Sequence, residues 1–128
     1  MSDFPADLLY TSDHEWAKIE GERIRVGITK FAVEQLGDIT LVTLDVKPGD
    51  VVDAGKAFGT IESVKTLSDL FAPVAGKIVE VNAALDKKPE LVNEDCYGAW
   101  MVVLEPTDFP PAGLLDPAAY AAHVKASG

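Results

Sequence analysis

The chain has 128 residues, 48% hydrophobic, 8% aromatic and 25% charged, which is an ordinary composition for one soluble globular domain. Its 21 acidic and 11 basic side chains give a formal net charge of −10, which argues against nucleic acid or anionic lipid as a partner because both need a cationic face. A single cysteine, Cys96, excludes an internal disulfide and a zinc site built from cysteines.

Turn signals recur every few residues along most of the chain, a rhythm that is typical of all-β sandwiches and barrels. Strands over residues 15–20 and 23–29 are expected to form a hairpin, and the alternation of apolar residues in the second strand buries one of its faces. A short helix over residues 30–36 follows, with Thr29 as its N-cap and Gly37 as its left-handed stop.

The middle of the chain is expected to be extended, apart from one helical turn over residues 82–85. The expected strands cover residues 38–46, 51–52, 58–65, 66–72, 77–81 and 99–105. Residues 49–54 and 76–81 also resemble each other weakly, since each has a turn glycine, a charge, two β-branched residues and an acid. A sandwich of two similar halves would place the region of Lys65 at the crossover between them.

The last part of the chain has a different composition. Residues 107–113 are rich in proline and glycine and are expected to be irregular. Asp116 and Pro117 make a good N-cap and first turn for a helix that reaches about residue 125 and packs on the sheet. Tyr120 and Val124 share one face of it. We therefore expect residues 1–128 to form one domain, with residues 107–128 as a C-terminal extension that ends in a helix.

Residues that could support catalysis or hold a metal are few. His14 and His123 are far apart and have no metal-ligand spacing, so two surface or edge histidines are expected. In so acidic a chain, Cys96 is better explained as a partly buried thiol than as a nucleophile. Gly55-Lys56 lacks the other residues of a phosphate-binding loop. We expect no catalytic residue, no metal site and no enzyme activity.

Neither an apolar run close to the roughly 20 residues of a transmembrane helix nor a signal or transit pattern is found, so we expect a cytoplasmic protein without a membrane partner.

The segment over residues 58–69 has an unusual composition. Two extended runs meet at Val64-Lys65-Thr66 with neither glycine nor proline between them, which is odd for a tight turn. The nearest acids to Lys65 in sequence are Glu62 and Asp69, so a lysine at this tip would be open to a modifying enzyme. Spacing alone still favours an ordinary solvated lysine.

Several short strings change this interpretation. They are Tyr10-Thr11, His14-Glu15-Trp16, Val26-Gly27-Ile28-Thr29, Glu34-Gln35-Leu36-Gly37-Asp38, Glu62-Ser63-Val64-Lys65, Ser68-Asp69 with Ala72-Pro73, and Leu91-Val92-Asn93-Glu94-Asp95. Together they resemble the H proteins of the glycine cleavage system, a family of lipoyl carriers, over most of the chain. The His-Glu-Trp and Glu-Ser-Val-Lys strings separate it from biotinyl domains and from the lipoyl domains of 2-oxoacid dehydrogenases.

The resemblance implies a mainly β, barrel-sandwich hybrid fold of the lipoyl and biotinyl domain type, with a short helix near residues 30–36 and a C-terminal helix. It implies that Lys65 carries lipoate in amide linkage. Lipoyl acceptors commonly have a glutamate before the lysine and a glycine after it, and Glu62 and Gly76 stand at those positions, where they would be recognised by the lipoylating enzyme.

The resemblance also implies a cleft that shelters the loaded arm. Glu15 and Asp69 match the positions that hold the cationic amine, and a pair of carboxylates in a partly dry cleft suits an ammonium. Gln35 falls on a cleft-lining position. Asp13 stands where the family often has a smaller polar residue, which adds negative charge near the cleft.

The implied function is that of a non-enzymatic, monomeric carrier. Its partners would be a pyridoxal-phosphate-dependent glycine decarboxylase, a tetrahydrofolate-dependent aminomethyltransferase, dihydrolipoamide dehydrogenase, and a lipoyl- or octanoyltransferase or lipoate ligase. Three alternatives stay open: the same fold relaying lipoate to other lipoate-dependent enzymes, an unmodified acidic interaction module with Lys65 as a surface residue, and, more distantly, an enzyme that uses Cys96.

Overall fold

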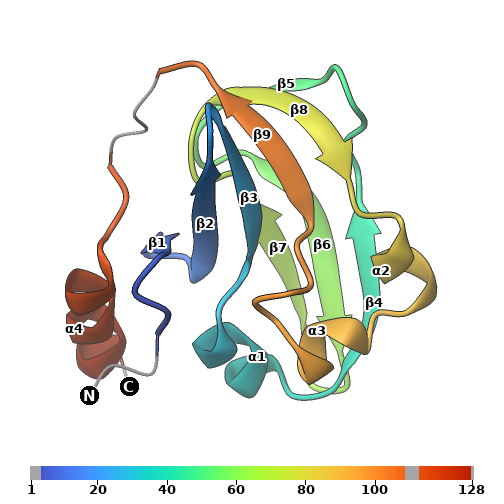
Figure 1. Ribbon diagram of the computed structural model, residues 1–128. Helices are drawn as coiled ribbons and strands as arrows, with labels where there is room; N and C mark the ends of the chain where they lie inside the picture. Colours follow the sequence, from blue (N-terminus) through green and yellow to red (C-terminus); the bar gives the residue numbers. More distant parts are fainter. Residues whose placement is uncertain (1–3, 109–112, 128) are drawn as a thin grey trace.

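The computed structural model describes residues 4–108 and 113–127. Its strands form two antiparallel sheets that face each other (Figure 1). The first sheet has the strand order β1 (Leu9–Tyr10), β2 (Glu15–Glu20), β3 (Arg23–Ile28), β9 (Val102–Pro106), β8 (Gly76–Val81), β5 (Val51–Val52). The second has the order β4 (Ile39–Leu44), β6 (Ala57–Ser63), β7 (Leu67–Phe71). The expected mainly β fold is confirmed, and the strands in these ranges form two sheets rather than a closed barrel.

Four helices flank the sheets in the described ranges. They are α1 (Lys30–Leu36), α2 (Ala84–Lys87), α3 (Leu91–Glu94) and α4 (Pro117–Ser127). The expected caps of α1 are confirmed: the Thr29 side chain accepts a hydrogen bond from Ala32 N, and Gly37 has a φ of +82°. The helical turn expected over residues 82–85 is displaced to Ala84–Lys87. The sequence analysis missed α3 and the two-residue strand β1, which are too short to produce a periodic pattern.

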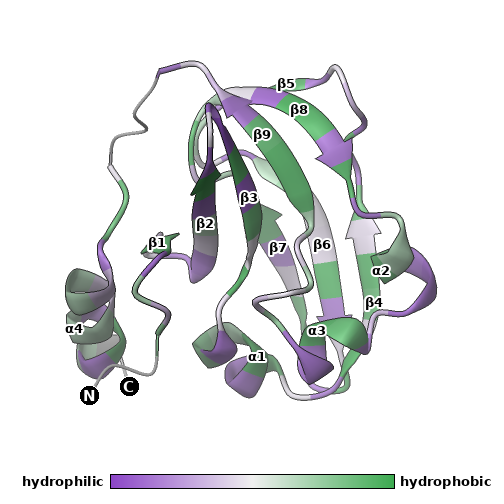
Figure 2. Ribbon diagram, viewed as in Figure 1, coloured by the Kyte–Doolittle hydropathy of each residue, from purple (hydrophilic) through white to green (hydrophobic). Residues whose placement is uncertain are grey.

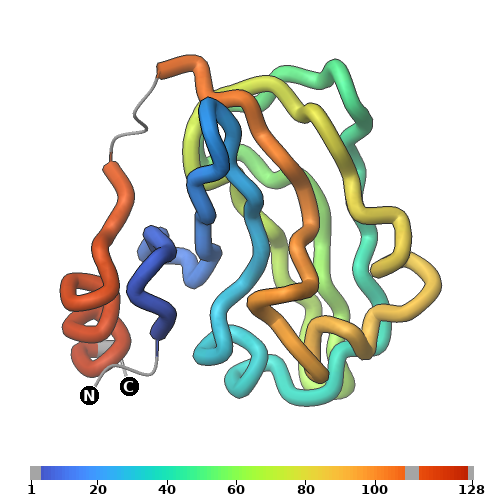
Figure 3. The backbone as a smooth tube through the Cα atoms, viewed as in Figure 1, coloured from blue at the N-terminus to red at the C-terminus, as the bar shows by residue number. Residues whose placement is uncertain are grey.

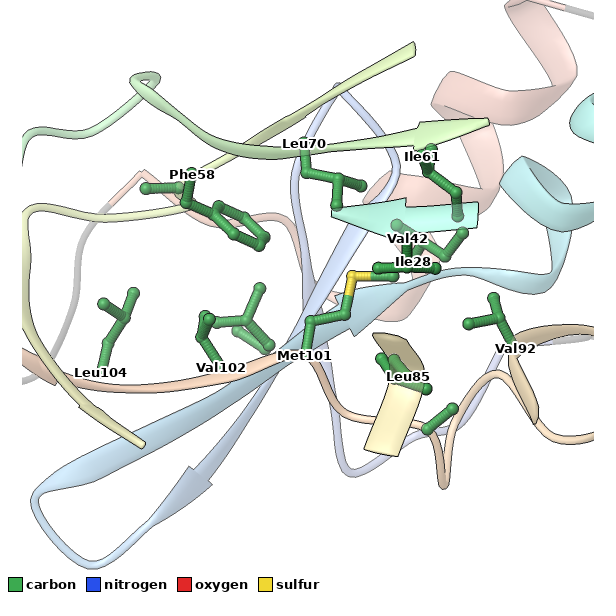
Figure 4. Close-up of a cluster of buried hydrophobic side chains, with 14 of the residues drawn as sticks. Ile28, Val42, Phe58, Ile61, Leu70, Leu85, Val92, Met101, Val102 and Leu104 are labelled. Carbon is green, nitrogen blue, oxygen red and sulfur yellow. The ribbon is translucent and has the colours of Figure 1, made fainter. Parts of the chain in front are cut away.

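The hydrophobic core lies between the two sheets (Figure 4). Val102 and Leu104 alternate along β9 in the first sheet, and they pack in one cluster with Phe58, Ile61 and Leu70 from the second sheet. The register of β6 shifts between Ala57 and Gly59, which allows both Phe58 and Ile61 to point inward. All five are buried, and each burial of this kind contributes roughly 1.5–3 kcal/mol to folding. Figure 2 shows β9 hydrophobic along most of its length, which fits its central place between β3 and β8.

The two weakly similar segments pair with each other. Val51 lies opposite Lys77 and Val52 opposite Gly76, where β5 joins the edge of β8. A β-carbon on Gly76 would lie only 2.5 Å from the carbonyl oxygen of Glu105, so close approach to β9 requires glycine there.

Helix α4 packs at the β1 edge of the first sheet (Figure 1). Tyr120 is fully buried there and stacks on Tyr10 with ring centroids 4.6 Å apart, in a second cluster that includes Trp16 and Val124. The predicted shared face of Tyr120 and Val124 is confirmed. Residues 109–112 of the segment expected to be irregular lie outside the described residues, and the single-domain organisation stays a prediction.

No helix in the described ranges is long and apolar enough to cross a membrane.

Candidate functional site

The turn that carries Lys65 is held by a serine side chain. The Ser63 hydroxyl oxygen accepts hydrogen bonds from Lys65 N and Thr66 N, both at 3.2 Å, and Ser63 N donates to Thr66 O at 2.8 Å. A serine that satisfies backbone groups two and three residues further on replaces the glycine that tight turns usually need. This explains the unusual composition of Val64-Lys65-Thr66.

A second loop supports the turn from outside. Val64 N donates to Asp38 O at 3.1 Å, which fastens the turn to the connection between α1 and β4 (Figure 3). Asn93 from α3 holds that connection on both sides, since its Nδ2 donates to Gly37 O at 3.0 Å and its Oδ1 accepts from Ile39 N at 2.8 Å. The backbone under Lys65 is therefore fixed by side chains from two separate elements.

The Lys65 side chain itself is exposed and forms no ion pair with a described residue. Its stem lies over Gly37, because a β-carbon built on that glycine would be 3.4 Å from Lys65 Cε and 3.8 Å from Nζ. The structure thus places an exposed amine without an ion pair among the described residues on a hydrogen-bonded turn, and the role of Lys65 as a lipoyl acceptor stays a prediction.

A cleft of about 320 Å³ opens beside this support, between α1 and the inner face of the second sheet. Its lining divides into an apolar floor and a polar rim. The floor residues include Ile28, Leu36, Ile61 and Leu70, and the polar residues are Asp13, His14, Glu15, Gln35, Ser68 and Asp69. Gln35 and Leu36 directly precede Gly37, so the support of Lys65 continues into the wall of the cleft.

Glu15 is the buried acid of this cleft, with only 2% of its surface exposed. Its Oε1 accepts from the Thr11 hydroxyl at 2.7 Å and its Oε2 from Phe71 N at 3.4 Å, while no cation of the described residues pairs with it. Burial raises the pKa of Glu15 to about 8, against the lowering effect of the two hydrogen bonds. A buried carboxyl without a counter-ion is a good site for a small cation.

The structure brings Glu15, Asp69 and Gln35 together in this cleft, although they lie far apart in sequence. Asp69 and Gln35 are exposed and belong to the rim. Glu62 lies outside the cleft, on the outward face of β6, and Gly76 lies buried in the other sheet. Close backbone approach explains the glycine at position 76, and its recognition by a lipoylating enzyme stays a prediction.

His14 connects the cleft to the C-terminal helix. Its Nδ1 lies 2.7 Å from the hydroxyl of Tyr120, which also lies 2.8 Å from Thr29 Oγ1, the N-cap of α1. His14 has a φ of +72°, an uncommon backbone conformation for a residue with a side chain. Burial and the nearby His123 lower the pKa of His14.

Two features of this site were missing from the sequence analysis. Asn93 was part of a quoted string but had no role, and a polar residue directly after the apolar pair Leu91-Val92 was its only local signal. The contact between His14 and His123, with ring centroids 5.5 Å apart, was also not predicted. No group of three or more residues that could hold a metal ion is found in the described ranges.

Cys96 lies away from the cleft and is buried. Burial and the neighbouring Asp95 raise the pKa of the Cys96 thiol to about 11, which is opposite to the shift that a nucleophilic cysteine needs. The expectation of a partly buried thiol agrees with these surroundings.

Fold and site together define a mainly β domain that presents one lysine beside an acid-lined cleft. A family model described as glycine cleavage H-protein matches residues 8–127. A glycine cleavage system H protein of Halalkalibacterium halodurans is 55% identical over 109 residues, 84% of each chain, and one of Bacteroides thetaiotaomicron is 52% identical over 123 residues, 94% of this chain and 97% of the relative. The chain belongs to the glycine cleavage H-protein family.

A solved structure agrees with this assignment. The crystal structure of a glycine cleavage system H protein from Mycobacterium marinum matches with a TM-score of 0.85 and 44% sequence identity, covering 93% of this chain and 97% of that one.

Proposed function

We propose that the protein carries lipoate in amide linkage on Lys65 and shuttles the aminomethyl group of glycine from glycine decarboxylase to an aminomethyltransferase. Lipoate on this lysine would supply a disulfide at the end of a long flexible arm. That disulfide would accept the aminomethyl group, and the dithiol left after its transfer would be reoxidised by dihydrolipoamide dehydrogenase. Attachment to a carrier raises the effective concentration of the arm at each active site that it visits.

One observation carries the proposal: the unpaired, exposed amine of Lys65 lies on a fixed turn whose support continues into an acid-lined cleft. The residues present fit a lipoyl group. The apolar floor around Ile61 and Leu70 suits a hydrocarbon arm, and the rim leaves the mouth of the cleft polar.

Glu15 and Asp69 are proposed to hold the cationic end of the loaded arm. Glu15 offers a carboxyl without a counter-ion inside the cleft, and Asp69 offers a second one at its rim. An ammonium near Glu15 favours the ionised form, so its arrival would release the proton that burial retains on this group. Gln35 is proposed to line the path between the turn and these acids.

The protein itself is proposed to be non-catalytic and monomeric, since a carrier must meet several enzymes in turn. The chemistry would then lie in its partners, and we propose that these are the enzymes of the glycine cleavage system together with a lipoyl-attaching enzyme. The cytoplasm is the proposed compartment, in keeping with a single buried cysteine.

Intact-mass measurement tests the proposal directly. Protein from lipoate-competent cells should gain the mass of one lipoyl group, and peptide mapping should place it on Lys65. Lys65→Arg should abolish the adduct while changing the free energy of unfolding by less than about 0.5 kcal/mol, as is usual for exposed residues. Lys56→Arg, at an exposed turn lysine next to the opposite end of β6, should keep the adduct.

The outcomes also separate the alternatives. An unmodified Lys65 would leave an acidic interaction module and overturn the carrier proposal. A lipoylated protein that glycine decarboxylase does not use, but that passes lipoate to other enzymes, would support the relay instead.

A further inference from the structure

Exposed apolar side chains gather around Lys65. In the described part of the chain, five large hydrophobic residues are exposed, and three of them lie on the hairpin that carries Lys65 or on the strand beside it. These three are Leu41, Val64 and Leu67, with exposed fractions of 41%, 67% and 63%. Single exposed apolar residues are normal, whereas a group of them around one functional side chain marks an interaction surface.

The strand register makes this group continuous. Leu41 on β4 lies opposite Glu62 on β6, and Glu62 lies opposite Leu67 on β7. Residues directly opposite each other in antiparallel strands point to the same face, with β-carbons roughly 5 Å apart. Leu41, Glu62 and Leu67 therefore form one row across the outer face of the second sheet, and Val64 extends it to the turn. We call these four residues the collar.

The collar combines apolar surface with one free negative charge. Glu62 is exposed and forms no ion pair with any residue that the structure describes. Asp38 and Asp69 lie exposed at its margins. An apolar centre with acids around it complements a partner surface that has an apolar groove and basic residues.

We propose that the collar is the docking surface for the enzyme that attaches the lipoyl group to Lys65, and that this enzyme presents an apolar groove with a basic side chain opposite Glu62. The inference rests on the proposed function, because it assumes that Lys65 is acylated. It assigns new roles to Leu41, Val64 and Leu67.

The length of the lysine side chain favours the lipoyl-attaching enzyme over the other three proposed partners, which are glycine decarboxylase, the aminomethyltransferase and dihydrolipoamide dehydrogenase. The attaching enzyme must bring its acyl group to the amine itself, and only a four-carbon stem separates that amine from the backbone. Hydrogen bonds to Ser63 and Asp38 hold the turn against the body of the protein. The rim of the active site must therefore rest on the collar. Enzymes that act on the far end of the finished arm have no such need.

The step itself is an acyl transfer. The unprotonated Nζ of Lys65 attacks the carbonyl carbon of an activated lipoyl or octanoyl group, supplied by the enzyme as a mixed anhydride with phosphate or as a thioester. A carbon–nitrogen bond forms, the bond from the same carbon to the phosphate oxygen or the sulfur breaks, and the nitrogen loses one proton. Water exclusion by the collar would protect the activated group from hydrolysis during this step.

The test compares collar variants with matched controls. Leu41→Thr and Leu67→Thr remove apolar surface but keep a residue that suits a strand. Ile19→Thr and Val51→Thr are the controls, since Ile19 is 42% exposed and Val51 70% exposed, and both lie in the other sheet. The unmodified full-length proteins are acylated by a purified lipoate ligase with lipoate and ATP, and the product is measured by intact mass.

Each collar variant should raise the KM for acylation by about fivefold to tenfold while kcat stays close to that of the wild type. The controls should stay close to the wild type in both constants. Glu62→Gln should raise KM at low salt and remove most of its salt dependence. The Lys65→Arg protein, which cannot be acylated, should bind the ligase directly, and adding Leu67→Thr should weaken that binding by a similar factor. Urea unfolding checks that the variants are folded.

Two results would overturn the docking proposal. An unchanged KM in the collar variants, with Lys65 acylated normally, would remove the collar and leave the carrier function standing. An equal rise in the KM of glycine decarboxylase for the fully lipoylated Leu67→Thr protein would show that the collar also docks glycine decarboxylase and is not a surface for the lipoyl-attaching enzyme alone. Failure of the wild-type protein to be acylated at all would instead overturn the proposed function.

Discussion

The side chain of Lys65 rests against Gly37, at the point where α1 ends. A β-carbon on Gly37 would lie 3.4 Å from Lys65 Cε, which is ordinary van der Waals contact, so an added methyl group would touch the lysine stem without displacing it. Gly37 also has a φ of +82°, a backbone conformation that other residues rarely adopt. One glycine therefore ends the helix and lies in contact range of the Lys65 stem.

Gly37→Ala separates these two effects when it is compared with Gly55→Ala. Gly55 has a φ of +81°, and a β-carbon there would have no neighbour within 4 Å. Both variants should lose about 1–3 kcal/mol in the free energy of unfolding from backbone strain. Only Gly37→Ala should change the NMR signal of the Lys65 Cε. Identical Lys65 signals in both variants would show that Gly37 does not support the lysine.

Glu15 should make stability depend on pH. Its pKa is raised from 4.5 to about 8, so the folded protein keeps a proton that the unfolded chain has already released. The free energy of unfolding should fall as pH rises between these values, with a contribution from Glu15 that approaches about 1.4 kcal/mol per pH unit. In urea unfolding, Glu15→Gln should lack this contribution. The free energy of unfolding of Glu15→Gln, relative to that of the wild type, should therefore increase between pH 4.5 and about pH 8 and stay constant at higher pH.

Glu80→Gln is the control for this prediction, because Glu80 is exposed on β8. It should follow the wild type at every pH. A Glu15→Gln protein that also follows the wild type would mean that Glu15 is already ionised in the cleft.

The cleft should bind a small ammonium ion through its two acids. Methylammonium, titrated into the unmodified protein and followed by NMR, should shift signals around Glu15 and Asp69. Glu15→Gln and Asp69→Asn should each weaken this binding by about twofold to fivefold, the range expected for partly solvated ion pairs. Binding by the wild type should strengthen as pH rises towards 8, because Glu15 releases its proton.

Asp53→Asn, which removes an exposed acid in the turn before Gly55, should leave methylammonium binding unchanged. Equal weakening by all three variants would indicate attraction to the net charge of the protein rather than a site in the cleft.

Tyr120 should couple the C-terminal helix to the cleft through its hydroxyl. Tyr120→Phe removes the partner of His14 Nδ1 and one partner of Thr29 Oγ1, and should cost about 1–3 kcal/mol. Tyr10→Phe is the matched control, because Tyr10 is equally buried and stacked on Tyr120, but its hydroxyl donates to Pro5 O. NMR titration should show a changed pKa of Glu15 only in Tyr120→Phe. An unchanged Glu15 in both variants would contradict the coupling.

Local chemistry made part of the fold predictable. Thr29 and Gly37 delimit α1 through hydrogen bonds and dihedral angles that depend on nearby residues alone, and the sequence predicted both ends correctly. Ser63 acts over the same short range, so its role in the Lys65 turn could have been found from its position two residues before the lysine. It was missed because the turn was judged by its lack of glycine and proline.

The cleft could be predicted from the sequence only through the family resemblance. No residue near Glu15 in sequence indicates that it shares a cleft with Asp69. That arrangement depends on how the two sheets bring β2 and β7 together. The meeting of His14 with His123 likewise depends on where α4 docks, which the stacking of Tyr120 on Tyr10 decides. Asn93 was unpredictable for the same reason, because its partners belong to a distant loop.

The bond between Tyr120 and His14 has a consequence for biosynthesis. During translation, every strand up to Pro106 is synthesised before Tyr120. The two sheets and the Lys65 hairpin are therefore complete before the residue whose hydroxyl bonds to His14, the neighbour of Glu15 in the cleft. A nascent chain released too early, or a mature one clipped by a protease ahead of α4, would still offer its amine for modification. The cleft beside that amine would then lack the contact between His14 and Tyr120.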